Sequence, residues 1–161
     1  MHLYSLLAST FYVLCFSPWS VLATGCSQGC GGGRSCGSIT NNSGKTLVYT
    51  TNPDPNLNAR PGRCRFWNWY SDDRAINIVP HDQTVSCTQD SLTSGSGKKG
   101  GCAQKIDVDG FSFASNRYWI LVPGSSVPIP VGAGVWTKFP NIIDVACTRV
   151  PVVGSILCAL A

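Results

Sequence analysis

Any catalysis by carboxylates in this chain must use Asp, because the sequence has eight Asp and no Glu. Two close pairs, Asp72-Asp73 and Asp107/Asp109, could supply the carboxylates for hydrolysis of a glycosidic bond. On a strand, Asp107 and Asp109 would point the same way, roughly 7 Å apart, which suits acid and base roles or a pair of calcium ligands. The competing interpretation, which we favour, is the polar outer face of a strand that ends in an Asp-Gly turn.

Other catalytic chemistry has less support in the sequence. Beyond the first 23 residues, His81 is the single histidine, and its position between Pro80 and Asp82 is typical of an exposed turn. The segment 95–99 lacks the first Gly and the final Ser or Thr of a phosphate-binding loop. We therefore predict no catalytic residues and no cofactor, and keep a small hydrolase using Asp carboxylates as the enzymatic alternative.

An aromatic cluster is the best candidate for binding. If residues 65–70 form a strand, Trp67 and Trp69 share the face opposite Phe66 and Tyr70. Two outward indoles could stack on sugar rings or enter a membrane interface, with nearby arginines adding polar contacts. Alternatively, both indoles are core of a strand covered on two sides. The candidate binding residues are Trp67, Trp69, Arg63 and Arg65.

The cysteines indicate a disulfide framework. Eight of the nine follow residue 23, and an even set in a short exported chain is typical of disulfide pairing. Eight cysteines allow 105 connectivities, which the sequence does not choose among, and a bridge between Cys147 and Cys158 is the one pairing that we single out as expected. We also expect a flexible surface loop over 88–101, tied down at Cys87 and Cys102. The first three cysteines of the set lack a fourth nearby ligand, so we predict no metal site. The predicted disulfide cysteines are Cys26, Cys30, Cys36, Cys64, Cys87, Cys102, Cys147 and Cys158.

The first 23 residues have the layout of a signal peptide. They contain an apolar run without Lys, Arg, Asp or Glu, then Pro18, then a cleavage site of small residues at Val21-Leu22-Ala23. The run is too short and too interrupted to span a bilayer, so we expect a secreted, extracellular protein without a transmembrane segment. Asn41-Asn42-Ser43 is a glycosylation sequon, which makes Asn41 a candidate site.

The remaining chain divides into a Gly- and Cys-rich strap (24–37), which has little capacity for regular structure, and one β domain (38–161). Short segments rich in β-branched and aromatic residues alternate with Gly and Pro turns. They predict an all-β, disulfide-stabilised sandwich or barrel of short antiparallel strands, with room for one short helix in 141–161. The expected strands cover 46–51, 65–70, 75–79, 84–87, 105–109, 118–122, 127–131 and 135–139.

The charge balance argues against nucleic acid as a partner. Twelve basic and eight acidic residues give a net charge of +4, with Arg60, Arg63 and Arg65 forming the densest cluster. This is modest for a nucleic-acid-binding protein, and an exported protein rarely meets nucleic acid, so we expect none. Weak attraction to anionic glycans or lipid headgroups is one interpretation, and ordinary solvated charge is the other.

Three segments carry a resemblance to a group of proteins: 39–47, 107–111 and 134–138. Together with the signal peptide and the cysteine count, they make the chain similar to the small secreted cysteine-rich proteins of fungi, which include candidate effectors. The resemblance implies a non-enzymatic protein that interacts with a host, competitor or cell-wall surface. Its expected partner is a cell-wall glycan or a host surface protein. A membrane-active or antimicrobial toxin is a further alternative, suggested by the positive charge and the apolar segment 150–161.

Overall fold

The computed structural model describes residues 36–69, 80–152 and 154–161. The expected signal peptide, residues 24–35 of the strap, Asp72-Asp73 and the expected strand at 75–79 lie outside these ranges.

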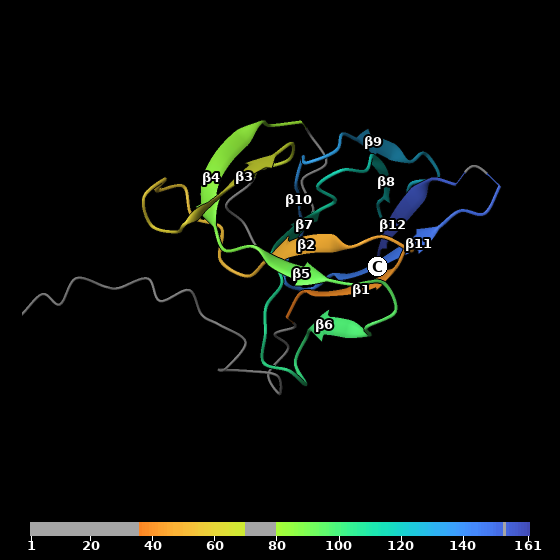
Figure 1. The fold of residues 1–161 in the computed structure, drawn as a ribbon, viewed down its shortest axis with the longest axis horizontal. Coiled ribbons are helices and arrows are strands. Elements are labelled where there is room, and N and C mark those ends of the chain that lie inside the picture. The colour runs from red at the N-terminus through yellow and green to blue at the C-terminus, as the bar shows by residue number, and fades with distance from the viewer. Residues whose placement is uncertain (1–35, 70–79, 153) are drawn as a thin grey trace, which may run out of the picture.

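The described part of the chain is all-β, as predicted (Figure 1). The expected helix in 141–161 was wrong, because this segment forms two strands instead. None of the described residues belongs to a helix long and apolar enough to cross a bilayer. The strands are β1 (Ser38–Asn42), β2 (Leu47–Thr50), β3 (Gly62–Phe66), β4 (Gln83–Cys87), β5 (Asp90–Leu92), β6 (Lys98–Gly100), β7 (Gly110–Ser112), β8 (Tyr118–Leu121), β9 (Ile129–Val131), β10 (Thr137–Lys138), β11 (Asp144–Arg149) and β12 (Ile156–Leu160).

The strands form three sheets. The largest has the order β6-β1-β11-β12-β8-β9, the second β10-β7-β2-β5, and the third is the β3–β4 hairpin. Most neighbours are antiparallel, as expected, but β1 pairs with β11 and β12 pairs with β8 in parallel. Parallel neighbours need a crossover, so the six-stranded sheet is assembled from segments far apart in the sequence.

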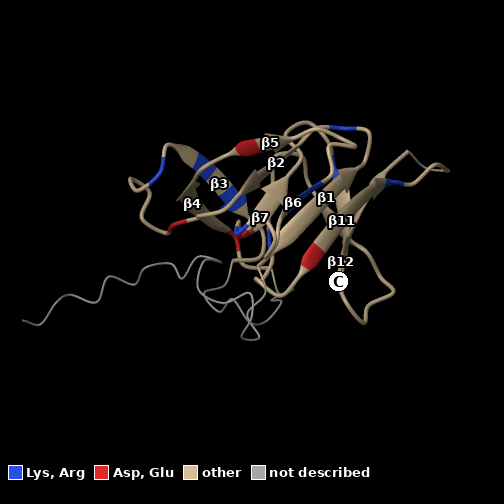
Figure 2. Cartoon of the chain, turned by 90° about the horizontal axis from the view of Figure 1, so that it is seen from below, with Lys and Arg blue, Asp and Glu red and all other residues tan. Residues whose placement is uncertain are grey.

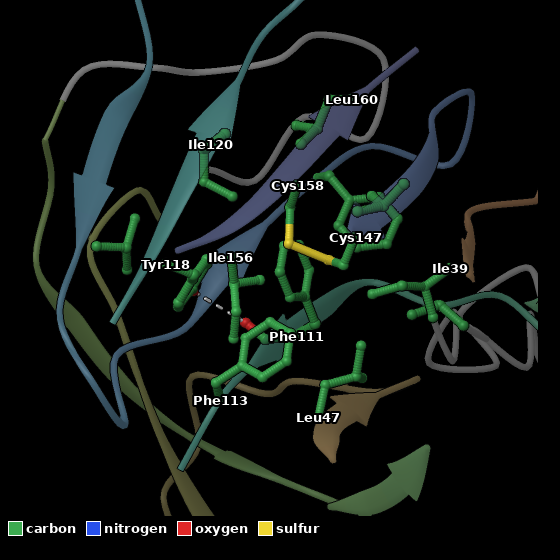
Figure 3. Close-up of a cluster of buried hydrophobic side chains, with 14 of the residues drawn as sticks. Ile39, Leu47, Phe111, Phe113, Tyr118, Ile120, Cys147, Ile156, Cys158 and Leu160 are labelled. Atoms are coloured by element: carbon green, nitrogen blue, oxygen red, sulfur yellow. Dashed lines mark hydrogen bonds between the residues drawn. A yellow bond between two sulfur atoms is a disulfide. The ribbon is translucent and has the colours of Figure 1, made fainter. Parts of the chain in front are cut away.

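The main core lies between the six-stranded and four-stranded sheets, which gives a sandwich-like arrangement (Figure 3). Alternation along the strands produces it: in β12, Ile156, Cys158 and Leu160 are buried, while the residues between them are half-buried. The four-stranded sheet faces them with Leu47 of β2 and Phe111 of β7. Burial of such side chains is the main stabilising contribution of the fold.

The β3–β4 hairpin packs on the other face of the four-stranded sheet. Its buried Phe66 and Val85 form a second apolar cluster with Trp136, and Val48 of β2 packs against it. Gly110 in β7 permits the close approach, since a Cβ atom there would lie 2.6 Å from the Phe66 ring. Gly110 therefore begins a strand and does not form the Asp-Gly turn that the sequence predicts.

Two other expectations from local sequence were wrong. Residues 105–109 do not form a strand, since Lys105 has a left-handed φ of 53° and Ile106 is exposed while Val108 is buried. The segment 88–101 is not an unstructured loop, because it contains β5 and β6. β5 and β6 pair with β2 and β1, whereas Val108 and Asp109 donate single backbone bonds to Gly37 and Thr50. Local composition does not reveal these distant partners.

Two disulfides join neighbouring strands. The expected Cys147–Cys158 bridge is confirmed, and it links directly opposite residues of β11 and β12 inside the main core (Figure 3). The second bridge joins Cys64 of β3 to Cys87 of β4, so Cys87 does not pair with Cys102. Cys36 and Cys102 are also disulfide-bonded, but their sulfur atoms lie 4.0 Å apart, too far for a bond to each other.

A buried chain of hydrogen bonds connects all three sheets. Trp67, just after β3, donates its indole N–H to the Thr137 hydroxyl of β10 at 2.9 Å. The same hydroxyl lies 2.9 Å from that of Tyr118 in β8, which also donates to the Val135 carbonyl at 2.8 Å. Burial raises the pKa of Tyr118 well above that of an exposed phenol, although the bond with Thr137 opposes the rise. The phenol therefore remains a neutral donor.

We expect Tyr118→Phe and Thr137→Val each to lower the free energy of unfolding by about 1–3 kcal/mol, because each leaves buried polar partners unpaired. Denaturant unfolding of the disulfide-intact protein measures the change. Tyr49→Phe removes the same atom from a half-buried position and serves as the control, with an expected change near zero. Equal effects at Tyr49 and Tyr118 would contradict the proposed importance of the buried chain.

Candidate functional site

The structure separates the two tryptophans that the sequence places on one outward face. Trp67 is half-buried against the main core, whereas Trp69 is half-buried against the hairpin cluster. Trp69 packs edge-on to Phe66, with ring centroids 5.4 Å apart, and Lys138 lies 5.5 Å from the Trp69 ring centre. The two indoles therefore do not form one exposed surface. Burial still alternates past the end of β3, with Phe66 and Asn68 buried and Trp67 and Trp69 half-buried, but the two indoles pack against different clusters. A binding role for either indole stays a prediction.

The two arginines of the predicted set do share a face. Arg63 and Arg65 alternate with buried Cys64 and Phe66 along β3, and both are exposed. Arg65 forms an ion pair with Asp82 at 2.7 Å, and the bond to that carboxylate raises the pKa of its guanidinium. This outward face of the hairpin is accessible to a ligand.

Asp107 and Asp109 do not lie on a strand, and their proposed chemistry depended on strand geometry. Asp107 is half-buried, and its Oδ1 accepts a hydrogen bond from the Gly37 N–H at 2.7 Å. The backbone of Asp109 bonds to Thr50 and Phe139. The carboxylates therefore sit on an irregular segment that connects β6 of the six-stranded sheet to β7 of the four-stranded sheet. His81 is exposed, as expected, and its Nδ1 lies 3.2 Å from the Trp69 carbonyl oxygen.

One pattern was missed in the sequence. Residues 33–37 have the Gly-x-Ser-x-Gly spacing of a nucleophile elbow, which joins a strand to a helix. Residues 33–35 lie outside the described ranges, and Gly37 leads directly into strand β1. The described residues also contain no group of three His, Cys, Asp or Glu side chains arranged to hold a metal ion.

The glycosylation candidate Asn41 is buried in the folded chain. Its amide N–H groups donate to the carbonyls of Lys45 and Leu92, at 2.7 and 2.8 Å, and its Oδ1 accepts from Ser43. The side chain therefore links β1 to β5 and is 0 % exposed. A glycan on this nitrogen would replace one of the two donating hydrogens and would need space that the buried site does not offer, which argues against the expected modification in the folded protein.

Protein secreted from a eukaryotic host should thus show no loss of mass at Asn41 after N-glycosidase treatment. Asn41→Ala should lower the free energy of unfolding by about 1–3 kcal/mol, because two carbonyls lose their donors in a buried site. Mass spectrometry and denaturant unfolding measure the two outcomes. A glycan found on Asn41 of correctly folded protein would contradict this assignment.

The outward face of the six-stranded sheet carries an aromatic residue that sequence reasoning missed. Trp119 lies between buried Tyr118 and Ile120 in β8 and is 39 % exposed, more than any other tryptophan in the described residues. Strand alternation over 118–121 was the signal that could have found it. Strand register places it directly opposite Leu157 of β12 and Pro130 of β9.

Two rows of outward side chains cross this sheet, and we call them the Trp119 face. Their strand-to-strand spacing of about 4.8 Å gives a surface roughly 19 Å long. Within the two rows, the charged residue is Lys98 at one end. The first row is Asn42, Thr148, Leu157, Trp119 and Pro130, and the second is Lys98, Thr40, Ala146, Ala159 and Leu121.

An ion pair links two strands near one edge of the six-stranded sheet. Lys98 of β6 lies 2.9 Å from Asp144 of β11, and the Ser38 hydroxyl of the intervening β1 donates to the same carboxylate. Partial burial would raise the pKa of Asp144, but the bonds from Ser38 and Lys98 and the Lys98 charge together lower it. Ionised Asp144 therefore stabilises the β6-β1-β11 edge above the ordinary carboxyl pKa, and this is lost as the pH falls through the lowered value.

An NMR titration should accordingly place the pKa of Asp144 below that of an unperturbed Asp. Lys98→Gln should move it upward, because the charge and one hydrogen bond are lost. Both side chains are well exposed, so the effect on the free energy of unfolding at neutral pH should stay below about 1 kcal/mol. A pKa of Asp144 that does not respond to Lys98→Gln would contradict this arrangement.

No protein-family model, no curated protein and no solved structure matches this chain. The chain's own geometry is therefore the basis for a functional assignment.

Proposed function

We propose that this is a secreted, non-enzymatic protein that binds neutral polysaccharide at a cell-wall or host surface through the Trp119 face. The observation that carries the proposal is the exposed Trp119 indole on the outward side of the six-stranded sheet, among largely uncharged residues. An indole face packs against the apolar C–H face of a sugar ring, and neighbouring polar side chains can bond its hydroxyls. The disulfides support an extracellular location, where such polymers occur.

The side chains around Trp119 favour a carbohydrate over other partners. Leu157 and Pro130 flank the indole, while Thr148 and Asn42 continue the row with a hydroxyl and an amide. This is the combination of apolar contact and polar orientation that sugar recognition requires. Docking to a membrane interface would instead favour a broader apolar surface with several cations at its rim.

The rigidity of the sheet also supports binding to an extended polymer. The central strands β11 and β12 are joined by the Cys147–Cys158 bridge directly beneath the Trp119 face. A surface that is already ordered loses little conformational entropy when it binds. Rows of outward side chains that cross several neighbouring strands can contact successive units of an extended chain.

Trp119→Ala should reduce retention on insoluble chitin, cellulose or β-glucan by about tenfold or more, because it removes the stacking surface. Trp119→Tyr should retain most of the binding, since an aromatic ring remains. Val127→Ala removes another exposed apolar side chain outside the two rows and is the matched control. Sedimentation of each variant with the polymer measures the retained fraction.

The melting temperature of each variant should stay close to that of the unmodified protein, because Trp119 lies outside the core. Equal retention of Trp119→Ala and the unmodified protein would refute the site. Failure of the unmodified protein to bind any of the three polymers would refute the ligand class. Release of soluble sugars during the incubation would favour the hydrolase alternative.

A further inference from the structure

We propose that the β3–β4 hairpin carries a second binding surface, for an acidic polysaccharide, formed by Arg60, Arg63 and Arg65. Two of these side chains project from the same face of β3, about 7 Å apart by strand geometry, and all three are exposed. They appear as two blue bands on β3 and a third blue segment in the adjoining loop in Figure 2. This proposal does not depend on the Trp119 face.

The immediate partners of these arginines leave most of the positive charge available. The Arg63 guanidinium donates to the carbonyls of Arg60 and Gly62, at 3.3 and 3.1 Å, and carbonyls do not neutralise it. Across the strand pair, Ser86 lies opposite Arg63 and Thr84 lies opposite Arg65. Within the part of the chain that the structure describes, ion pairing at this face is confined to Arg65 and Asp82.

The acidic groups near this face already have other contacts. Asp82 pairs with Arg65, and the Asp54 carboxylate accepts a hydrogen bond from the Asn56 N–H at 2.8 Å. The net charge of the hairpin and of the loop before β3, counted over the described residues, is small and positive. Such a balance predicts weak binding that depends strongly on ionic strength.

The backbone that presents the arginines is held firmly. The Cys64–Cys87 bridge joins the two strands between the arginine positions, and Phe66 anchors β3 in the hairpin cluster. The Gln89 side chain donates to the Arg63 carbonyl at 3.0 Å. The spacing of the guanidinium groups is thus set before a ligand arrives, which lowers the entropic cost of binding.

The geometry favours a polymer with repeated acidic groups over a single anion or a membrane. Guanidinium groups bind carboxylate and sulfate through two parallel hydrogen bonds, and a strand spaces them along a line. A lipid surface would require apolar side chains that insert, and Leu57 is the exposed large apolar residue of the adjoining loop. The hairpin and strands β11 and β12 lie toward opposite ends of the molecule in Figures 1 and 2, so the two faces can act separately.

Affinity electrophoresis in gels containing polygalacturonate or heparin tests the proposal. The unmodified protein should be retarded at low salt, and the double variant Arg63→Gln/Arg65→Gln should bind about tenfold more weakly. Arg60→Gln, which breaks no ion pair, should weaken binding to a smaller extent. Lys45→Gln/Lys105→Gln removes the same charge from exposed positions elsewhere and should bind as the unmodified protein does.

The outcomes separate this site from the alternatives. Equal weakening by the lysine and arginine double variants would overturn the site in favour of general net-charge attraction. Binding to phosphatidylserine vesicles that Leu57→Ser abolishes, without retardation by either polysaccharide, would overturn it in favour of a membrane. Trp119→Ala should leave the retardation unchanged, so failure of the Trp119 face and failure of the arginine face are distinguishable. Thermal unfolding of each variant checks that the hairpin remains folded.

Discussion

The buried contact between Trp67, Thr137 and Tyr118 is the constraint on which the arrangement of the three sheets depends. One hydroxyl, that of Thr137 in the four-stranded sheet, meets the indole N–H that follows β3 and the phenol of β8. Apolar packing between sheets is non-directional and tolerates sliding, whereas hydrogen bonds between buried groups fix distance and orientation. These polar atoms therefore set how the hairpin and the six-stranded sheet lie on the four-stranded sheet.

The buried Asn41 side chain has a comparable effect at the other side of the core. It joins β1, the following turn and β5, which belong to different sheets. Polar groups in such positions are costly unless every donor and acceptor is satisfied. Here both N–H groups and the carbonyl oxygen of Asn41 have partners. Asn41 belongs to a glycosylation sequon in the sequence, but in the structure its side chain links two sheets by hydrogen bonds.

The same architecture leaves two outward surfaces of different chemistry. The Trp119 face is largely uncharged, because Ala146 and Thr148 of β11, Leu157 and Ala159 of β12, and Trp119 and Leu121 of β8 occupy its central positions. The hairpin face is basic, because outward positions of β3 are arginines and their cross-strand neighbours are hydroxyl residues. Disulfides under each face keep its shape. The two proposals assign neutral polysaccharide to the first surface and acidic polysaccharide to the second.

The sequence alone determined the all-β class and several strands, because alternation, β-branched content and turn residues are local properties. It offered the Cys147–Cys158 bridge as one pairing, and the structure selected it. The sequence also identified Arg60, Arg63 and Arg65 as the densest basic cluster, but the face that Arg63 and Arg65 share became evident only in the structure. The tertiary structure decided which face of each strand is covered. In the folded chain Asn41 is buried, and Trp67 and Trp69 contact different clusters beyond the end of β3. Residues 105–109 do not form a strand, and Trp119 is exposed. A period of two defines two faces of a strand, but only the packing of distant segments determines which of them meets solvent.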